Sequence, residues 1–389
     1  MAGHPDPLRH ARPNRGFTGR LWAMVMKEFI QLRRDRLTLA MIVIIPFMEL
    51  MLFGYAINMN PKHLPIAILS ADNSDITRDF VAALKQTGYF DIRQEARTEE
   101  QADAMIRSGR VLFVLQIPPG FGRDVRRGAR PRILLVTDAT DPVATGGAIS
   151  AVNGLAGRLF LRELRGPHAD LAGRPPPFEL VIQKRYNPAA ITAINIVPGL
   201  IGVILTMTML IFTSLAVTRE LERGTMESLL ATPLRPSEIM LGKIAPYVLV
   251  GFVQMAIIMA AGRFLFGVPL TGSAGLLLTL TMIFIAANLS LGYTISTIAR
   301  NQLQAVQMSF FFFLPSILMS GFMFPFQGMP AWARFIGEML PLTHYLRIVR
   351  GIMLKGAGWP DLVQEGFALV AFMLTVMVIA VLRFRQTLD

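Results

Sequence analysis

AGLLLTLTMIFIAANLSLGYTISTI, the stretch from Ala274 to Ile298, consists mainly of apolar residues. A helix that crosses the hydrocarbon core of a bilayer needs about 20 such residues. Comparable apolar runs lie on both sides of this stretch, at residues 37–57, 191–217, 244–266, 305–326 and 367–382. The sequence therefore predicts an α-helical polytopic membrane protein with six transmembrane helices.

The composition of the chain agrees with that class. Of 389 residues, 53% are hydrophobic and 16% are charged, whereas a soluble domain carries about 25% charged residues. The net charge of +12 fits basic cytoplasmic segments near anionic headgroups better than a nucleic-acid partner. The absence of cysteine excludes disulfides, thiolate metal sites and thiol nucleophiles.

Lys and Arg in the short flanks predict the orientation. About 36 polar and basic residues precede the first apolar run, and no small-residue cleavage site follows it, so this run is expected to be retained. The loop at 218–243, the turn after Ile298 and the tail at 383–389 fall on the same side in a six-span count. They carry the basic residues Arg219, Arg223, Arg235, Lys243, Arg300, Arg383 and Arg385. Both termini are therefore predicted to be cytoplasmic.

Residues 58–190 then lie on the outer side of the membrane, in the periplasm if the cell has one. Short apolar runs of strand length alternate there with helical patterns. The strands are expected at Pro65–Ser70, Val111–Ile117 and Pro131–Thr137, and the helices at Ile76–Lys85, Glu99–Ile106 and Pro142–Arg165. This order favours an inserted α/β extracytoplasmic domain.

Two predicted cytoplasmic segments carry amphipathic and helix-capping patterns that a plain connection between spans does not need. Gly16–Arg36 repeats apolar residues at helical spacing with cations between them, which is typical of a helix in the membrane interface. In the loop at 218–243, Thr225 and Ser237 are suited to cap two short helices. We expect a polar-faced helical hairpin that docks another protein; the alternatives are a topology-setting anchor and a plain connection.

The loop ELERGTMESLLATPLRPSEIMLGKIAPY, Glu220–Tyr247, resembles the cytoplasmic signature of the permeases of ABC-2 type exporters. Three further stretches resemble the same family: KEFIQLRRDR, YNPAAITAINIVPGLIG and LPLTHYLRIVRGI. The resemblance covers the whole chain in order. Within the family, the chain is most similar to bacterial multidrug-efflux permeases of the inner membrane that work beside a separate ATPase subunit.

The resemblance implies a dimer, formed with a second copy or a homologous permease, and outward transport driven by ATP. It implies that the ATPase docks on the interfacial helix and on the loop after the second span. The residues it assigns to this coupling are Lys27, Glu28, Arg33, Arg34, Asp35, Glu220, Glu222, Arg223, Gly224, Thr225, Glu227 and Pro233. A periplasmic adaptor is a further possible partner, and the expected cargo is amphiphilic, drug-like or lipid-like.

No phosphate-cradling G-x-x-x-x-G-K-[ST] run exists in the chain, since Gly242-Lys243 is followed by Ile244. We therefore expect no cofactor and no catalytic site here, and expect ATP and Mg²⁺ to bind to the partner ATPase. One rival interpretation is a multi-span membrane sensor with a ligand-binding periplasmic domain. A proton-driven carrier is another, but it needs several carboxylates within the membrane, and only Glu49 falls clearly inside a predicted span.

Four polar residues in the predicted spans are candidates for a substrate pathway: Glu49, Asn195, Asn288 and Gln307. A carboxylate at the membrane centre costs about 2.5–3.5 kcal/mol, so it usually faces a partner or a wet cavity. Glu49 could bind a cationic substrate, relay a proton or pair structurally. Hydrogen bonding between helices is the competing role for the other three.

Residues 327–366 hold two amphipathic segments, Pro330–Leu340 and Leu342–Lys355, that are too short or too charged to span. They are predicted to be re-entrant or interfacial helices that close the outer end of a pathway. His344 has no companion ligands for a metal. At the ends of the predicted strands, turn and N-cap chemistry competes with a catalytic role for four aspartates, Asp72, Asp75, Asp138 and Asp141.

Overall fold

The computed structural model describes residues 61–163, 178–189, 191–222 and 236–386, and all of these belong to one compact unit of the chain. Its first part alternates strands and helices. They are β1 (Leu64–Ser70), α3 (Asp75–Gln86), β2 (Phe90–Glu95), α4 (Glu99–Arg107), β3 (Phe113–Ile117), α5 (Phe121–Arg126), β4 (Arg132–Asp138), α6 (Pro142–Glu163) and β5 (Glu179–Arg185). The three apolar runs of strand length lie in β1, β3 and β4.

The five strands form one mixed sheet in the order β2-β1-β3-β4-β5. β1 is parallel to β2 and β3, and β4 is parallel to β5, whereas β3 and β4 are antiparallel. Parallel neighbours need a long crossover connection, usually a helix. Helices α3, α4 and α6 supply those crossovers.

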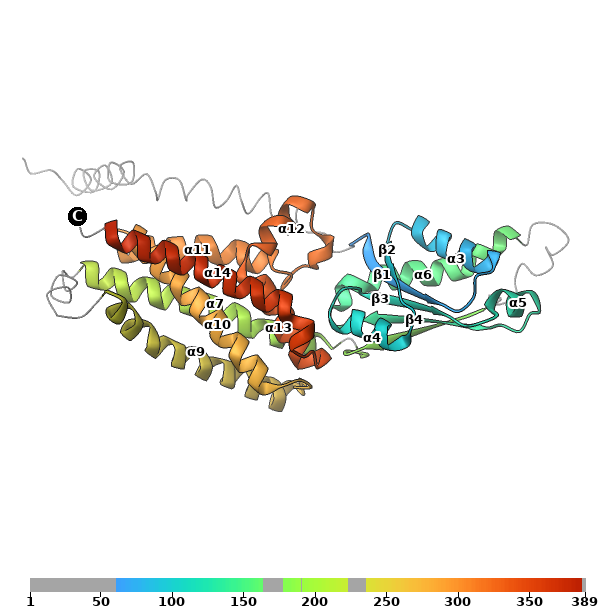
Figure 1. The fold of residues 1–389 in the computed structure, drawn as a ribbon, viewed down its shortest axis with the longest axis horizontal. Helices are drawn as coiled ribbons and strands as arrows, with labels where there is room; N and C mark the ends of the chain where they lie inside the picture. The colour runs from blue at the N-terminus through green and yellow to red at the C-terminus, as the bar shows by residue number, and fades with distance from the viewer. Residues whose placement is uncertain (1–60, 164–177, 190, 223–235, 387–389) are drawn as a thin grey trace, which may run out of the picture. The chain divides into compact units, whose positions relative to one another are not determined.

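Both faces of the sheet are covered, as Figure 1 shows. Ile66, Phe113 and Leu135 pack on one face with side chains of α3, α5 and α6. Ala67 and Val114, the next residues along β1 and β3, pack on the other face with α4. Burial on both faces explains why the central strands read as continuous apolar runs.

The second part of the unit is helical. It comprises α7 (Thr192–Glu222), α9 (Pro236–Phe266), α10 (Ala274–Ile298), α11 (Gln302–Met319), α12 (Ala331–Glu338), α13 (Pro341–Lys355) and α14 (Trp359–Gln386). Five of these helices, α7, α9, α10, α11 and α14, are long and apolar enough to cross a membrane. The additional span expected at residues 37–57 lies outside the described residues.

The predicted bounds of two spans were wrong. Helix α11 ends at Met319 instead of residue 326, because Gly321 takes a positive φ of 85°, which breaks the helix. Helix α14 begins at Trp359, well before residue 367. Its first turn is capped by the Asp361 carboxylate, which accepts a hydrogen bond from the Gly358 amide at 3.1 Å.

The helices also extend into the loop predicted at 218–243. Helix α7 continues to Glu222, and α9 begins at Pro236, a residue that favours the first helical position. Ser237 is therefore the second residue of α9 and does not occupy the cap position that was predicted for it. The remainder of the predicted hairpin, residues 223–235, lies outside the described residues.

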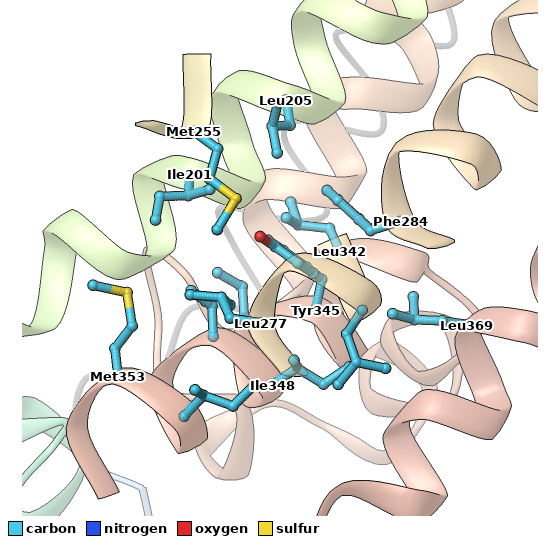
Figure 2. Close-up of a cluster of buried hydrophobic side chains, with 14 of the residues drawn as sticks. Ile201, Leu205, Met255, Leu277, Phe284, Leu342, Tyr345, Ile348, Met353 and Leu369 are labelled. Carbon is cyan, nitrogen blue, oxygen red and sulfur yellow. The ribbon is translucent and has the colours of Figure 1, made fainter. Parts of the chain in front are cut away.

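Helix α10 is the centre of the helical part, with contacts to α7, α9, α11, α13 and α14. Tyr345 of α13 is fully buried there, and its ring stacks on Phe284 of α10 with centroids 4.0 Å apart. Figure 2 shows Tyr345 among apolar side chains from α7, α9 and α10. The short helix α13 is thus part of the core, although it is too short to span.

The outer surfaces of α9 and α14 are apolar. Leu249 and Ile257 of α9 are 68% and 62% exposed, and Phe367 of α14 is 72% exposed. Contiguous apolar surface of this kind needs lipid or another protein chain around it. Together with the five long apolar helices, these surfaces identify a multi-pass membrane protein.

Candidate functional site

Following the chain from helix to helix assigns each helix end to one of the two ends of the bundle. We call the end where α7 follows β5 the sheet end, and the end where α7 leads into residues 223–235 the loop end. At the sheet end, the turn between α9 and α10 contacts α13, since the Thr271 amide donates to the Met353 carbonyl at 3.0 Å. The start of α14 lies there too.

At the loop end, the last residue of α7 holds the start of α11. The Glu222 carboxylate accepts a hydrogen bond from the Gln302 amide N–H at 2.7 Å and another from Gln302 Nε2 at 2.5 Å. Gln302 is the first residue of α11, where backbone N–H groups are unpaired and the helix dipole favours an anion. Two spans are therefore joined at the point where the predicted coupling loop begins.

The structure places two of the expected coupling residues, Glu220 and Glu222, in the last turn of α7. The other ten lie outside the described residues: Lys27, Glu28, Arg33, Arg34, Asp35, Arg223, Gly224, Thr225, Glu227 and Pro233. The contact with Gln302 was not anticipated, because nothing in the local sequence links positions 80 residues apart.

The expected pathway residues are not brought together. Asn195 lies in the first turn of α7 and Gln307 in the second turn of α11, which are near opposite ends of the bundle. At 1.5 Å per residue, Asn195 is about 40 Å from the loop end of α7. Asn288 is buried in α10, and its amide donates to the Phe284 carbonyl of its own helix at 2.9 Å; among the described residues it forms no hydrogen bond to another helix. Glu49 lies outside the described residues.

Hydroxyl groups form the polar contacts between helices instead. Ser214 of α7 and Ser309 of α11 are 3.0 Å apart, and Thr281 of α10 and Tyr345 of α13 are 2.8 Å apart. Such bonds are typical of packed membrane helices. Sequence reasoning passed over them because serine and threonine are common in spans and carry no distinguishing pattern.

A charged cluster occupies the sheet end, which we call the His344 cluster: Glu338 of α12, His344 and Arg347 of α13, and Glu365 of α14. His344 Nδ1 lies 2.5 Å from Glu365 Oε2, and His344 Nε2 lies 2.8 Å from the Glu338 carbonyl oxygen. Arg347 donates to both carboxylates, at 2.5 Å to Glu338 and at 3.2 Å to Glu365. The cluster ties three helices together.

The geometry requires a proton between His344 and Glu365. A carbonyl oxygen only accepts, so Nε2 must carry a proton; the short contact at Nδ1 needs a second one. Burial by itself lowers the pKa of His344, but the hydrogen bonds to Glu365 and to the Glu338 carbonyl outweigh it and raise that pKa. With His344 charged, two cations face two carboxylates and the cluster is neutral.

The sequence pointed to His344 and Arg347 only as parts of an amphipathic segment. Their spacing of three residues places them on one face of a helix, which is a signal for a shared partner. Glu365 was missed because residues 327–366 were assigned to a segment that does not span, whereas Glu365 lies within α14.

The four aspartates at the strand ends have structural partners. Asp72 accepts hydrogen bonds from Ser74 and Thr77, and Asp75 pairs with Arg126. The other two, Asp138 and Asp141, lie at the end of β4 and directly before α6. Asp138 accepts from Thr140 and from Lys355 Nζ at 2.5 Å, and Asp141 accepts from the backbone of α6. Turn, capping and ion-pair roles account for all four.

Comparison with known proteins gives the family. Residues 36–382 match the ABC-2 family transporter proteins. The chain is 32% identical to the probable multidrug ABC transporter permease YbhS of Escherichia coli K12 over 95% of this chain and 98% of that protein. It is 30% identical to the inner membrane transport permease YhhJ of the same strain, over 98% and 99%.

A third relative, the probable multidrug ABC transporter permease YbhR of Escherichia coli K12, is 28% identical over 88% of this chain and 94% of that protein. These matches run almost end to end, so they include both the sheet and the helices. They do not favour the sensor interpretation. The chain belongs to the ABC-2 transporter family and is a multi-pass membrane subunit of an ABC transporter.

Proposed function

We propose that this chain is an exporter permease that couples ATP hydrolysis by a separate ATPase subunit to outward transport of an amphiphilic, drug-like or lipid-like substrate. It works as a dimer in the bacterial inner membrane, with both termini cytoplasmic. The names of the relatives, probable multidrug ABC transporter permease and inner membrane transport permease, support this proposal.

The contact between Glu222 and Gln302 carries the proposal. A push on the loop at 218–243 acts directly on the end of α7, and Glu222 passes it to the first turn of α11. Helix α11 leads to α12, whose Glu338 is joined to α14 through Arg347 and His344. Hydrogen bonds and ion pairs between successive helices therefore connect the loop end to the sheet end, so a movement at one end can be passed to the other.

The division of labour follows from the sequence. The chain has no phosphate-binding loop, so ATP and Mg²⁺ are assigned to the partner ATPase. Of the proposed coupling residues, Glu220 and Glu222 lie in the last turn of α7, and this position at the loop end supports the proposed contact with the ATPase. The residues assigned to the interfacial helix and to positions 223–233 complete the proposed docking surface.

The test uses proteoliposomes that contain the full chain with its co-purified ATPase. Glu222→Ala removes both hydrogen bonds and the charge at the start of α11. We expect transport of an amphiphilic dye per ATP hydrolysed to fall by about fivefold or more, since hydrogen bonds to charged groups contribute about 1.5–3 kcal/mol. Glu222→Gln keeps an acceptor and is expected to fall between wild type and Glu222→Ala.

Glu99→Ala is the matched control, because Glu99 is an exposed carboxylate in the first turn of α4. Wild-type transport efficiency in Glu222→Ala would contradict the coupling role. Failure of any ATPase to co-purify, or ATP-driven movement of dye in the opposite direction, would contradict the proposed function itself.

A further inference from the structure

A cavity of about 480 Å³ lies beside the His344 cluster, within the range of about 300–1,000 Å³ that small-molecule sites occupy. Its apolar lining includes Phe326, Leu346 and Leu362, and its cations include Arg334 of α12 and Arg350 of α13. Acidic residues line it as well: Asp138, Asp141, Glu338, Asp361 and Glu365. Charged and apolar walls in one cavity suit a ligand that has both characters.

Arg350 is a partly buried cation whose hydrogen bonding is incomplete. Its Nη1 donates to the Gly321 carbonyl at 3.1 Å. Its Nε is buried and has no hydrogen-bond partner among the described residues. Nε is thus a donor without an acceptor, and the guanidinium edge formed by Nε and Nη2 has the geometry that matches the two oxygens of a carboxylate or phosphate.

The carboxylates nearest to Arg350 are engaged elsewhere. Asp138 is bound to Lys355 and Thr140. Asp141 accepts hydrogen bonds from the amides of Val143 and Ala144 at the start of α6. No ion pair joins Arg350 to an acidic residue in the part of the chain that the structure describes.

Burial lowers the pKa of Arg350, and the charges of Asp141 and Asp138 offset this effect only in part. The guanidinium nevertheless stays protonated in proteins. A partly buried charge without a counterion is destabilising, and the cavity that borders Arg350 gives room for a counterion. Arg334, which is exposed on the same cavity wall, adds attraction for an anion.

We propose that Arg350 binds the anionic group of an amphiphile, a carboxylate, phosphate or sulfonate, whose apolar part rests on Phe326, Leu346 and Leu362. This proposal rests on the proposed function for its biological meaning, because the amphiphile is then cargo leaving the membrane. The site lies at the sheet end, the end that the proposed orientation puts outside the cell.

The test compares two fluorescent probes with the same tail, dansylundecanoic acid and its methyl ester, on the purified full chain in an uncharged maltoside detergent at pH 8. Fluorescence titration is expected to show that the acid binds about tenfold more tightly than the ester. Arg350→Gln should weaken binding of the acid about tenfold and leave binding of the ester unchanged. Arg350→Lys keeps the charge without the planar edge, so its affinity for the acid should lie between that of the wild type and that of Arg350→Gln.

Arg263→Gln is the charge-matched control, since Arg263 is exposed in the last turn of α9 and does not line the cavity. Equal binding of acid and ester to the wild type, or a preserved preference in Arg350→Gln, would overturn the proposal. Displacement of the acid by inorganic phosphate at the acid's own binding concentration would also overturn it, because the site would then serve a free anion.

Gel filtration and thermal unfolding establish whether the variants are folded. If Arg350→Gln is not folded, the binding preference of Arg350→Lys tests the proposal instead. The measurement needs neither ATP nor the ATPase. A chain that fails to export in proteoliposomes but retains the acid preference would therefore refute the proposed function and leave the anion site standing. The converse result would refute the site alone.

Discussion

At the scale of single residues, His344 has an acceptor at each ring nitrogen, the Glu365 carboxylate at Nδ1 and the Glu338 carbonyl at Nε2. The Glu338 carboxylate lies 4.0 Å from Nε2, and Arg347 is the cation that faces the same carboxylates. The pKa of His344 is raised in the folded protein. The protonated histidine therefore stabilises the packing of α13 on α12 and α14.

The sign of the pH dependence follows. A raised pKa in the folded state stabilises the protein fully below the unfolded value of about 6.5, and the effect is lost as pH rises through the folded pKa. We expect wild type to exceed His344→Gln in stability by about 1.5–3 kcal/mol near pH 6, and this difference to shrink toward pH 9. Thermal unfolding in detergent across that range measures it.

His63→Gln is the control for this experiment, because His63 is exposed and lies outside the His344 cluster. Its unfolding temperature should keep the wild-type dependence on pH. A difference between wild type and His344→Gln that grows as pH rises would show that the pair is held without the extra proton, and would contradict the assignment.

At the scale of elements, the crossing of α7 and α10 depends on Gly292. A Cβ at this position would lie 2.8 Å from the Leu210 carbonyl oxygen and 3.0 Å from Thr213 Cβ. Because the nearest atom is backbone, the helices themselves would have to move. We expect Gly292→Ala to destabilise the protein by about 1–3 kcal/mol, although alanine is the better helix former.

Gly146→Ala is the matched control in α6, where a Cβ would meet no atom within 4 Å. There the same substitution should be neutral or stabilise by up to about 1 kcal/mol. Unfolding temperatures of the two variants give the comparison. Stabilisation at both positions would mean that helix propensity, and not the close approach of α7, decides the effect.

The elements that the sequence predicted are those with a continuous signal. Ala274–Ile298 coincides with α10, and the central strands β1, β3 and β4 lie on the apolar runs. Strands β2 and β5 were missed because they form the two edges of the sheet. Their sequences, FDIRQE and ELVIQKR, mix polar and apolar residues, as strands with only one neighbour can.

At the scale of the whole molecule, the functional contacts were the least predictable. Glu222 and Gln302 are 80 residues apart in sequence, and His344 and Glu365 are 21 apart. Periodicity and capping rules act over a few residues, so they predicted the helices but not which side chains of different helices contact one another. The resemblance to ABC-2 permeases singled out the region of Glu222, whereas no pattern marked Arg350 as a partly buried cation.

Orientation is also a property of the whole molecule, and the absence of cysteine makes it measurable with single introduced thiols. Helix α10 is about 37 Å long at 1.5 Å per residue, which exceeds the hydrocarbon core of about 30 Å. We therefore expect Leu270 and Arg300, which flank it and are both exposed, to lie on opposite sides of the membrane.

We expect a membrane-impermeant maleimide to label Leu270→Cys in intact spheroplasts, and Arg300→Cys only after permeabilisation, because basic residues favour the cytoplasmic side. Labelling of Arg300→Cys alone would invert the proposed topology and place the Glu222 contact beyond reach of any cytoplasmic ATPase. Labelling of both in intact spheroplasts would mean that α10 does not span. Since Glu222 and Arg300 leave the bundle at the same end, this one measurement also decides whether the push proposed for α7 and α11 comes from the side where ATP is present.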